Sequence, residues 1–125
     1  MASTKNPVNW FEIPATDLAR ARKFYEVVFG CELTTAEIGP CRMAWFPMNN
    51  EIGGSSGSLV QGEGYIPAKT GTVVYFTVDD IPAALARIVA NGGTELQAKT
   101  GIGEYGFIAR FGDTEGNVVA LHSFK

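Results

Sequence analysis

Two side chains stand out as candidates for proton transfer. Glu12 lies within an apolar segment of strand character, and the chain has a single histidine, His122. A carboxylate on the inner side of a strand is costly unless it is paired, so Glu12 is a candidate general base or ligand-orienting acceptor. Histidine changes its charge near neutral pH. We therefore take Glu12 and His122 as the candidate catalytic residues.

Each of these assignments has a structural alternative. Glu12 could form an ion pair with an arginine or lysine, or it could face solvent. His122 lies near the C-terminus and could be the solvated end of a strand. Aromatic side chains nearby could fill a cleft rather than hold a ligand.

Aromatic and hydroxyl side chains are expected beside these two groups. Side chains alternate between the two faces of a strand, and Phe11 and Ile13 suit a core, so Trp10 and Glu12 should share the opposite face. The same alternation along two later strands turns Tyr75, Thr77 and His122 to that face, and a third strand adds Trp45 or Arg42. The predicted ligand-binding residues are Trp10, Tyr75, Trp45 and Thr77.

Composition and charge limit the classes of partner. The 125 residues are 46% hydrophobic with a net charge of −3, which is typical of one globular domain over 1–125. The chain has no Lys/Arg cluster, which argues against nucleic acid and anionic membrane as partners. Cys31 and Cys41 form no C-x-x-C pair, and residues 1–7 lack the apolar stretch of a signal peptide. We expect a cytoplasmic protein with reduced thiols.

An internal repeat organises the elements that must position these side chains. Shifting the chain by 63 residues places Asp17 on Asp80 and Gly30 on Gly93. In each copy an extended apolar segment precedes an acidic residue that can cap a helix, and the helix carries one apolar stripe. Glycine ends each helix, where a left-handed residue is favoured. Three shorter extended segments follow each helix, so each copy is β-α-β-β-β.

The predicted fold is therefore α+β. Two tandem βαβββ modules, at about 7–62 and 71–123, should form a curved eight-stranded mixed sheet with the helices on its outer face. The concave face then forms a cleft, a common place for small-molecule ligands.

Several motifs resemble one known family. Trp10–Asp17, Arg20–Tyr25 and Phe29-Gly30, with a matching Val78–Asp80 and a closing Asp113–Val118, are similar to the vicinal oxygen chelate superfamily of glyoxalases, bleomycin-resistance proteins and extradiol dioxygenases. The resemblance covers nearly the whole chain. It is specific for fold and weaker for function, because this fold hosts many chemistries.

The resemblance implies a divalent metal held by His, Glu or Gln from paired strands. Three of its ligand positions fall on Trp10, Val73 and Ala120, and a fourth falls near Ser58–Leu59. The first three side chains have no atom that can ligate a metal. We therefore predict no metal centre and no cofactor. The resemblance also implies a homodimer whose partner chain completes the cleft, which could bring two His122 residues together.

Three functions are compatible with these residues. The favoured one is a metal-independent protein that binds an aromatic or cationic small molecule in the cleft, as bleomycin-resistance relatives do. The alternative is a lyase- or isomerase-type enzyme, related to lactoylglutathione lyase, that uses Glu12 with Tyr75 or His122 as acid and base. The third is an interaction module whose cleft is filled by its own side chains.

Overall fold

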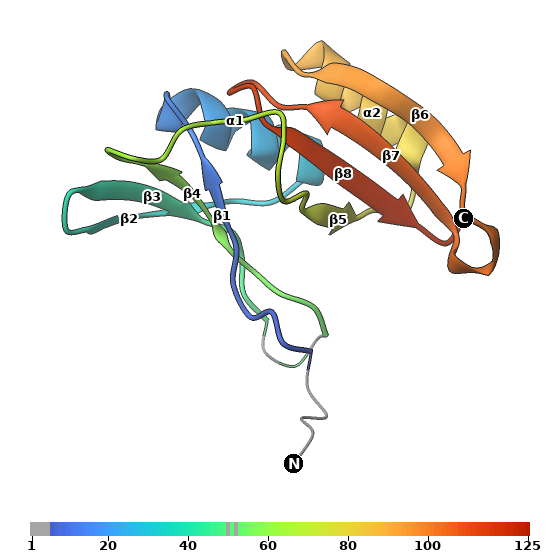
Figure 1. Cartoon of the computed structure of the whole chain (residues 1–125), viewed down its shortest axis with the longest axis horizontal. Coiled ribbons are helices and arrows are strands. Elements are labelled where there is room, and N and C mark those ends of the chain that lie inside the picture. Colours follow the sequence, from blue (N-terminus) through green and yellow to red (C-terminus); the bar gives the residue numbers. More distant parts are fainter. Residues whose placement is uncertain (1–5, 50, 52) are drawn as a thin grey trace.

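The computed structural model describes residues 6–49, 51 and 53–125, so most of the segment tested for a signal peptide lies outside the described residues. The first module, at the left of Figure 1, has the predicted βαβββ order. Its elements are β1 (Glu12–Pro14), α1 (Leu18–Phe29), β2 (Thr34–Ile38), β3 (Cys41–Trp45) and β4 (Ser58–Gln61).

The second module repeats this order and adds one short 3-10 turn, Gly103–Tyr105. Its elements are β5 (Tyr75–Thr77), α2 (Ile81–Ala90), β6 (Thr94–Gly101), β7 (Phe107–Gly112) and β8 (Val118–Ser123). The predicted caps are confirmed: the Asp17 and Asp80 side chains accept backbone N–H groups of the first helical turns. Gly30 ends α1 with a left-handed φ of 62°.

The eight strands form two hydrogen-bonded mixed sheets of four, which gives the α+β fold expected for two βαβββ modules. The strand orders are β1-β4-β3-β2 and β5-β8-β7-β6. Within each sheet the first strand of the module pairs in parallel with the last. The edge strands β1 and β5 therefore face each other across the seam between the modules (Figure 1).

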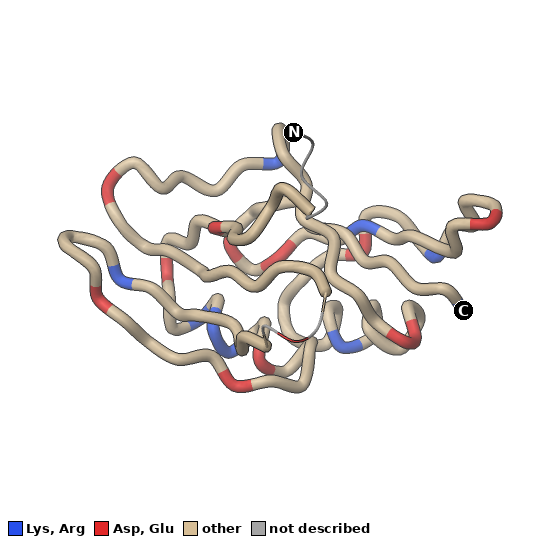
Figure 2. The backbone as a smooth tube through the Cα atoms, turned by 90° about the horizontal axis from the view of Figure 1, so that it is seen from below, with Lys and Arg blue, Asp and Glu red and all other residues tan. Residues whose placement is uncertain are grey.

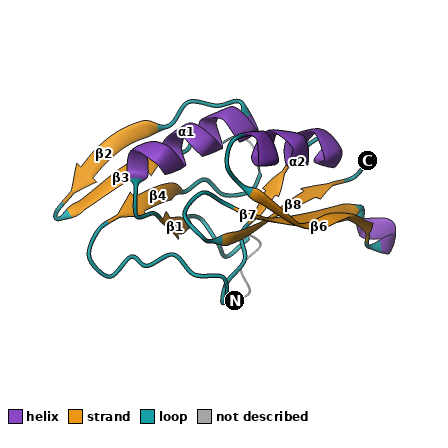
Figure 3. Cartoon of the chain, turned by 90° about the horizontal axis from the view of Figure 1, so that it is seen from above, coloured by secondary structure: helices purple, strands orange, loops and turns teal. Residues whose placement is uncertain are grey.

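Both helices lie on the same side of the two sheets, as Figure 3 shows. They contact each other, and the Arg87 guanidinium of α2 donates to the Val28 carbonyl oxygen of α1 at 2.9 Å. Neither helix of the described chain is long and apolar enough to cross a bilayer. Figure 2 shows the Lys and Arg positions spread along the backbone rather than gathered in one region.

One core joins the two modules. Aromatic rings from α1, from β5 and β7, and from the residues beside β1 and β3 meet under the seam, and Phe29 of α1 stacks on Phe76 of β5 with ring centroids 4.3 Å apart. The predicted alternation is confirmed, because Ile13, Val119 and Leu121 are buried in this core. Burial of these apolar side chains is the main source of stability.

A polar clamp, the turn Asp113–Asn117 between β7 and β8, ties the second module to the first. The Glu115 side chain is 1% exposed, and its carboxylate accepts the backbone N–H groups of Thr16 and Asp17 at 2.9 and 2.8 Å. Arg20 of α1 binds the same carboxylate at 2.7 Å. An anion at this position also satisfies donors that the N-terminal end of a helix leaves open.

A second carboxylate of the clamp is buried deeper. Asp113 accepts the hydroxyl of the fully buried Tyr25 at 2.7 Å and the side-chain amide of Asn117 at 2.9 Å. Burial, together with the charge of Asp113, raises the pKa of Tyr25 well above 10. The same Asn117 amide donates to the Pro14 carbonyl oxygen at 2.8 Å, which fixes the end of β1.

The clamp predicts an acid-sensitive fold. Burial alone would raise the pKa of Glu115, but hydrogen bonds from Arg20, Asp17, Thr114 and Thr16 together lower it to about 2 from 4.5. The folded state thus binds this proton less tightly than the unfolded chain does. Its stabilisation is full above about pH 5 and is lost as the pH falls toward 2.

We expect Glu115→Gln to lower the free energy of unfolding by roughly 1 to 3 kcal/mol at pH 7 and to flatten its decline between pH 5 and 2. Urea unfolding across that pH range measures both effects. Glu32→Gln, at an exposed position, is the matched control. If the free energy of unfolding of the Glu115 variant depended on pH as that of the parent does, this role of Glu115 would be contradicted.

Candidate functional site

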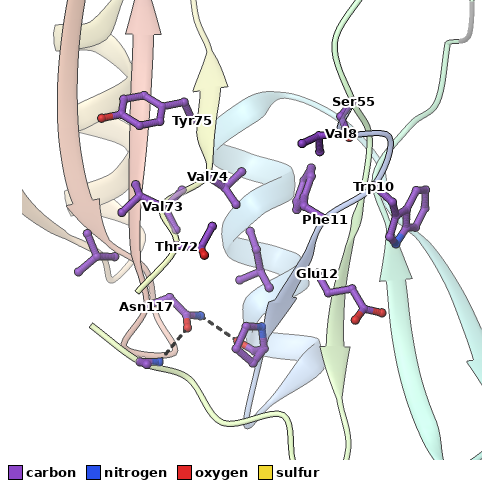
Figure 4. A pocket seen from close by; sticks show the side chains of 15 residues that line it. Val8, Trp10, Phe11, Glu12, Ser55, Thr72, Val73, Val74, Tyr75 and Asn117 are labelled. Carbon is purple, nitrogen blue, oxygen red and sulfur yellow. Dashed lines mark hydrogen bonds between the residues drawn. The ribbon is translucent and has the colours of Figure 1, made fainter. Parts of the chain in front are cut away.

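A pocket lies at the seam between the two modules. Its volume is about 530 Å³, and it opens between β1 and the segment that leads into β5 (Figure 4). Most of its wall is apolar. The lining residues are Val8, Trp10, Phe11, Glu12, Ile13, Pro14, Ser55, Ala68, Thr72, Val73, Val74, Tyr75, Asn117, Val118 and Val119.

The structure brings three of the six predicted site residues to this pocket. Trp10, Glu12 and Tyr75 line it, and Tyr75 is 46% exposed. They do not form one wall, because Figure 4 shows the Trp10 and Glu12 side chains turned toward β4 and the Tyr75 ring turned toward β8. The expected single cleft wall thus has two parts, a module-one face with Trp10 and Glu12 and a module-two face with Tyr75.

Trp45 belongs to the module-one face. Its ring meets that of Trp10 edge to face, with centroids 5.6 Å apart. Trp45 pairs in register with Ser58 of β4, which in turn pairs with Glu12. The Trp45 Nε1 and the Ser58 Oγ are both buried without a hydrogen-bond partner among the described residues. The module-one face therefore holds two buried polar groups that no side chain or backbone group of the described residues satisfies.

Glu12 is exposed, and its one side-chain partner in the described chain is an aromatic hydroxyl. Tyr65 donates to the Glu12 carboxylate at 3.3 Å, and the charge of Glu12 raises the pKa of Tyr65. No arginine or lysine of the described chain pairs with Glu12. The carboxylate is thus available on the pocket wall. Sequence reasoning did not include Tyr65, whose only signal is being the one aromatic residue of a linker.

The remaining two predicted residues lie on the module-two face. Thr77 of β5 pairs in register with His122 of β8. The His122 Nε2 lies 2.6 Å from the Tyr105 carbonyl oxygen, which can only accept a hydrogen bond, so this nitrogen carries the proton. The imidazole also packs edge to face on Phe124, at 4.8 Å between ring centroids. His122 is therefore held in place away from Glu12.

The family resemblance implied a fourth metal-ligand position near Ser58–Leu59, and strand pairing identifies this position as Ser58. Glu12 and Tyr75 correspond under the repeat; Glu12 pairs with Ser58 and Tyr75 pairs with Ala120. Ser58 is therefore the counterpart of Ala120. The four positions carry Trp10, Ser58, Val73 and Ala120, a set with one hydroxyl oxygen and no imidazole or carboxylate. These residues do not fit a divalent metal, which needs three or more nitrogen or oxygen ligands.

The rest of the described chain offers no alternative metal site. No group of three or more His, Cys, Asp or Glu side chains lies close enough to hold a metal ion within residues 6–49, 51 and 53–125. What the site offers instead is an apolar, aromatic pocket with one carboxylate on its rim. Paired βαβββ modules with a pocket at their seam define a class of small curved-sheet domains.

The chain belongs to the glyoxalase/bleomycin resistance protein/dioxygenase superfamily, whose sequence profile matches residues 8–121. A glyoxylase-like domain-containing protein from Didymella fabae is 34% identical over 118 residues, which is 91% of each chain. The resemblance seen in the sequence is therefore confirmed at the level of the family.

Solved structures show the same fold at lower identity. A glyoxylase/bleomycin resistance protein/dioxygenase domain from Frankia sp. EAN1pec superposes with a TM-score of 0.74 at 14% identity, covering 98% of this chain and 100% of that one. A glyoxalase I mutant from Zea mays gives 0.70 at 21% identity over 94% of this chain. The present chain spans about half the length of the maize protein, at 46%.

The position of β1 at the pocket depends on one close backbone approach. Gly57 precedes β4, and a Cβ added there would overlap the Phe11 carbonyl oxygen and ring. We expect Gly57→Ala to lower the free energy of unfolding by about 1 to 3 kcal/mol, because β1 or the loop must shift.

Thermal or urea unfolding measures this cost. Gly53→Ala is the control, because a Cβ there meets nothing within 4 Å. The two variants having equal stability would show that β1 tolerates the shift and that Gly57 does not fix the pocket wall.

Proposed function

We propose that this protein binds an aromatic or cationic small molecule in the pocket at the seam, without a metal. The observation that carries the proposal is a carboxylate, Glu12, on the rim of a pocket walled by Trp10, Phe11 and Tyr75. Glu12 has no ion-pair partner in the described chain. Aromatic rings bind aromatic ligands by stacking, and ring faces attract cations. A pocket of about 530 Å³ suits a compound of drug-like size.

Charge supports the cationic part of the proposal. The chain has a net charge of −3, which favours the approach of cations over anions. Glu12 makes no ion pair in the described chain, so a bound ammonium group would not have to displace one. The Tyr65 hydroxyl would stay beside the carboxylate and orient it.

Intrinsic fluorescence tests this binding directly. The chain has two tryptophans, and they are the contacting pair Trp10 and Trp45 beside the pocket. We expect benzylamine and phenyltrimethylammonium to change this fluorescence in a saturable way. Glu12→Gln should weaken both by about two- to tenfold, because a partly solvated carboxylate contributes modestly.

Glu32→Gln is the charge-matched control, and benzyl alcohol is the neutral ligand whose affinity should not change in the Glu12 variant. Equal affinity of the parent and the Glu12 variant for the cations would overturn the charged part of the proposal. If none of these aromatic compounds changed the fluorescence in a saturable way, the proposal that the pocket binds a ligand would be overturned.

Metal independence follows from the donor set at Trp10, Ser58, Val73 and Ala120. We expect protein purified without a histidine tag, then dialysed against nickel, zinc or manganese, to retain far less than one metal per chain. Its thermal midpoint should not shift, because a ligand that binds the folded state must stabilise it. A tightly held metal near one per chain would contradict the proposal and bring glyoxalase-type chemistry forward.

We also propose a homodimer. Trp10 of the module-one face and Tyr75 of the module-two face are turned to opposite sides of the pocket, and a second copy of the chain would cover both (Figure 4). A symmetric dimer is the commonest oligomer. Sedimentation equilibrium at micromolar concentration should give twice the chain mass of 13.4 kDa, and a single-chain mass would contradict this part.

A lyase- or isomerase-type enzyme is the second candidate. The observation in its favour is the Tyr65 hydroxyl bound to the Glu12 carboxylate, a donor–acceptor pair beside a pocket. A general base must lie within hydrogen-bond reach of the proton that it removes. Turnover whose pH–rate profile changes in Glu12→Gln would support the enzyme, and saturable binding without turnover supports the binding protein.

A further inference from the structure

The module-two face, formed by the β5, β6, β7 and β8 side chains that point away from the helices, carries an arginine that the proposed function does not use. Ala109 and Phe111 of β7 are buried in the core, so Arg110 between them points to the opposite face. On β8, Val119 and Leu121 are core residues, and Ala120 shares the face of Arg110.

Strand register places four of these side chains in one row across the sheet. Tyr75 pairs with Ala120, Ala120 pairs with Arg110, and Arg110 pairs with Gln97, which lies between two register shifts of β6. Paired residues on neighbouring strands project to the same side. Neighbouring strands lie about 4.8 Å apart, so the backbones of Tyr75 and Arg110 are roughly 10 Å apart across Ala120. The small alanine, fully buried, forms the floor between them.

Among the strand residues that pair on this face in the described chain, Arg110 is charged and no side chain is a carboxylate. Arg110 is half-buried and takes part in no ion pair or side-chain hydrogen bond within the described residues. The residues paired on this face are Tyr75, Thr77, Gln97, Thr100, Ile108, Arg110, Gly112, Val118, Ala120 and His122. None is acidic, and the Nε2 of His122 is already used by the Tyr105 carbonyl oxygen. A partly buried arginine with no partner in the described chain favours an anionic ligand.

The geometry points to a carboxylate-binding site on this face, with Arg110 as the anion-binding residue. The planar guanidinium can hold both oxygens of a carboxylate. The neighbouring Gln97 amide donates one N–H to the Thr100 hydroxyl at 3.2 Å and can donate its other N–H to one of these oxygens. The Tyr75 ring, 46% exposed, lies on the other side of the alanine floor and offers a surface for stacking. The ligand is therefore a small aromatic carboxylate, with its acid group at Arg110 and its ring at Tyr75.

The first test is calorimetric titration of the full chain with benzoate, together with NMR of the arginine Nε–Hε resonances. We expect benzoate to shift the Arg110 resonance and to bind at least tenfold more weakly to Arg110→Gln, because hydrogen bonds to charged groups are the strong ones. Arg110→Lys keeps the charge but loses the two-oxygen geometry, and it should fall between the two.

Arg42→Gln is the matched control: Arg42 is exposed on β3 and likewise has no ion pair in the described chain. Acetate tests the ring, since Tyr75→Ala should weaken benzoate and leave acetate unchanged. Benzoate affinity unchanged in Arg110→Gln, or lost equally in Arg42→Gln, would overturn the site. The tryptophan response to benzylamine is a separate readout, so failure here would leave the seam pocket untouched.

Discussion

The arrangement of the two modules depends on the clamp, the buried turn Asp113–Asn117. Its carboxylates reach residues almost a hundred positions earlier in the chain, at the start of α1 and on Tyr25. Glu115 binds the backbone N–H groups of Thr16 and Asp17, which precede α1, while Asp113 and Asn117 bind each other as well as the first module. Buried charges persist only when they are fully hydrogen-bonded, so these contacts allow little variation in how the modules meet.

The seam pocket is a consequence of that constraint. No strand ladder joins β1 to β5, so backbone hydrogen bonds do not set their separation. The Asn117 amide fixes it instead, because it binds the Pro14 carbonyl oxygen at the end of β1 and accepts from the Ala68 N–H of the linker (Figure 4). The aromatic core beneath, where Phe29 stacks on Phe76, fills the space on the helix side. The opposite side stays open as a pocket.

The elements could be predicted from the sequence because their signals are local. Asp17 and Asp80 cap helices by contacts within one turn, and alternation along a strand separates core from ligand-facing residues. The division of the site could not be predicted. Trp10 and Tyr75 were expected on one wall, but the angle between modules is set by Glu115 and Asp113, which in sequence are only part of a polar turn. The role of Tyr65 depends on the path of a linker and has no periodic signal.

Under the proposed metal-independent function, the site must use other groups in place of an ion. An indole, a hydroxyl, an isopropyl group and a methyl group cannot polarise a bound oxygen as a divalent cation does. A ligand that covers the apolar side chains of Trp10 and Val73 gains affinity in proportion to the apolar area that it removes from water. Directional recognition has to come from side chains on the neighbouring register positions. These are Glu12, two positions after Trp10, and Arg110, paired with Ala120 across the sheet. If both proposals hold, each module carries one binding surface, and the two surfaces have opposite charge.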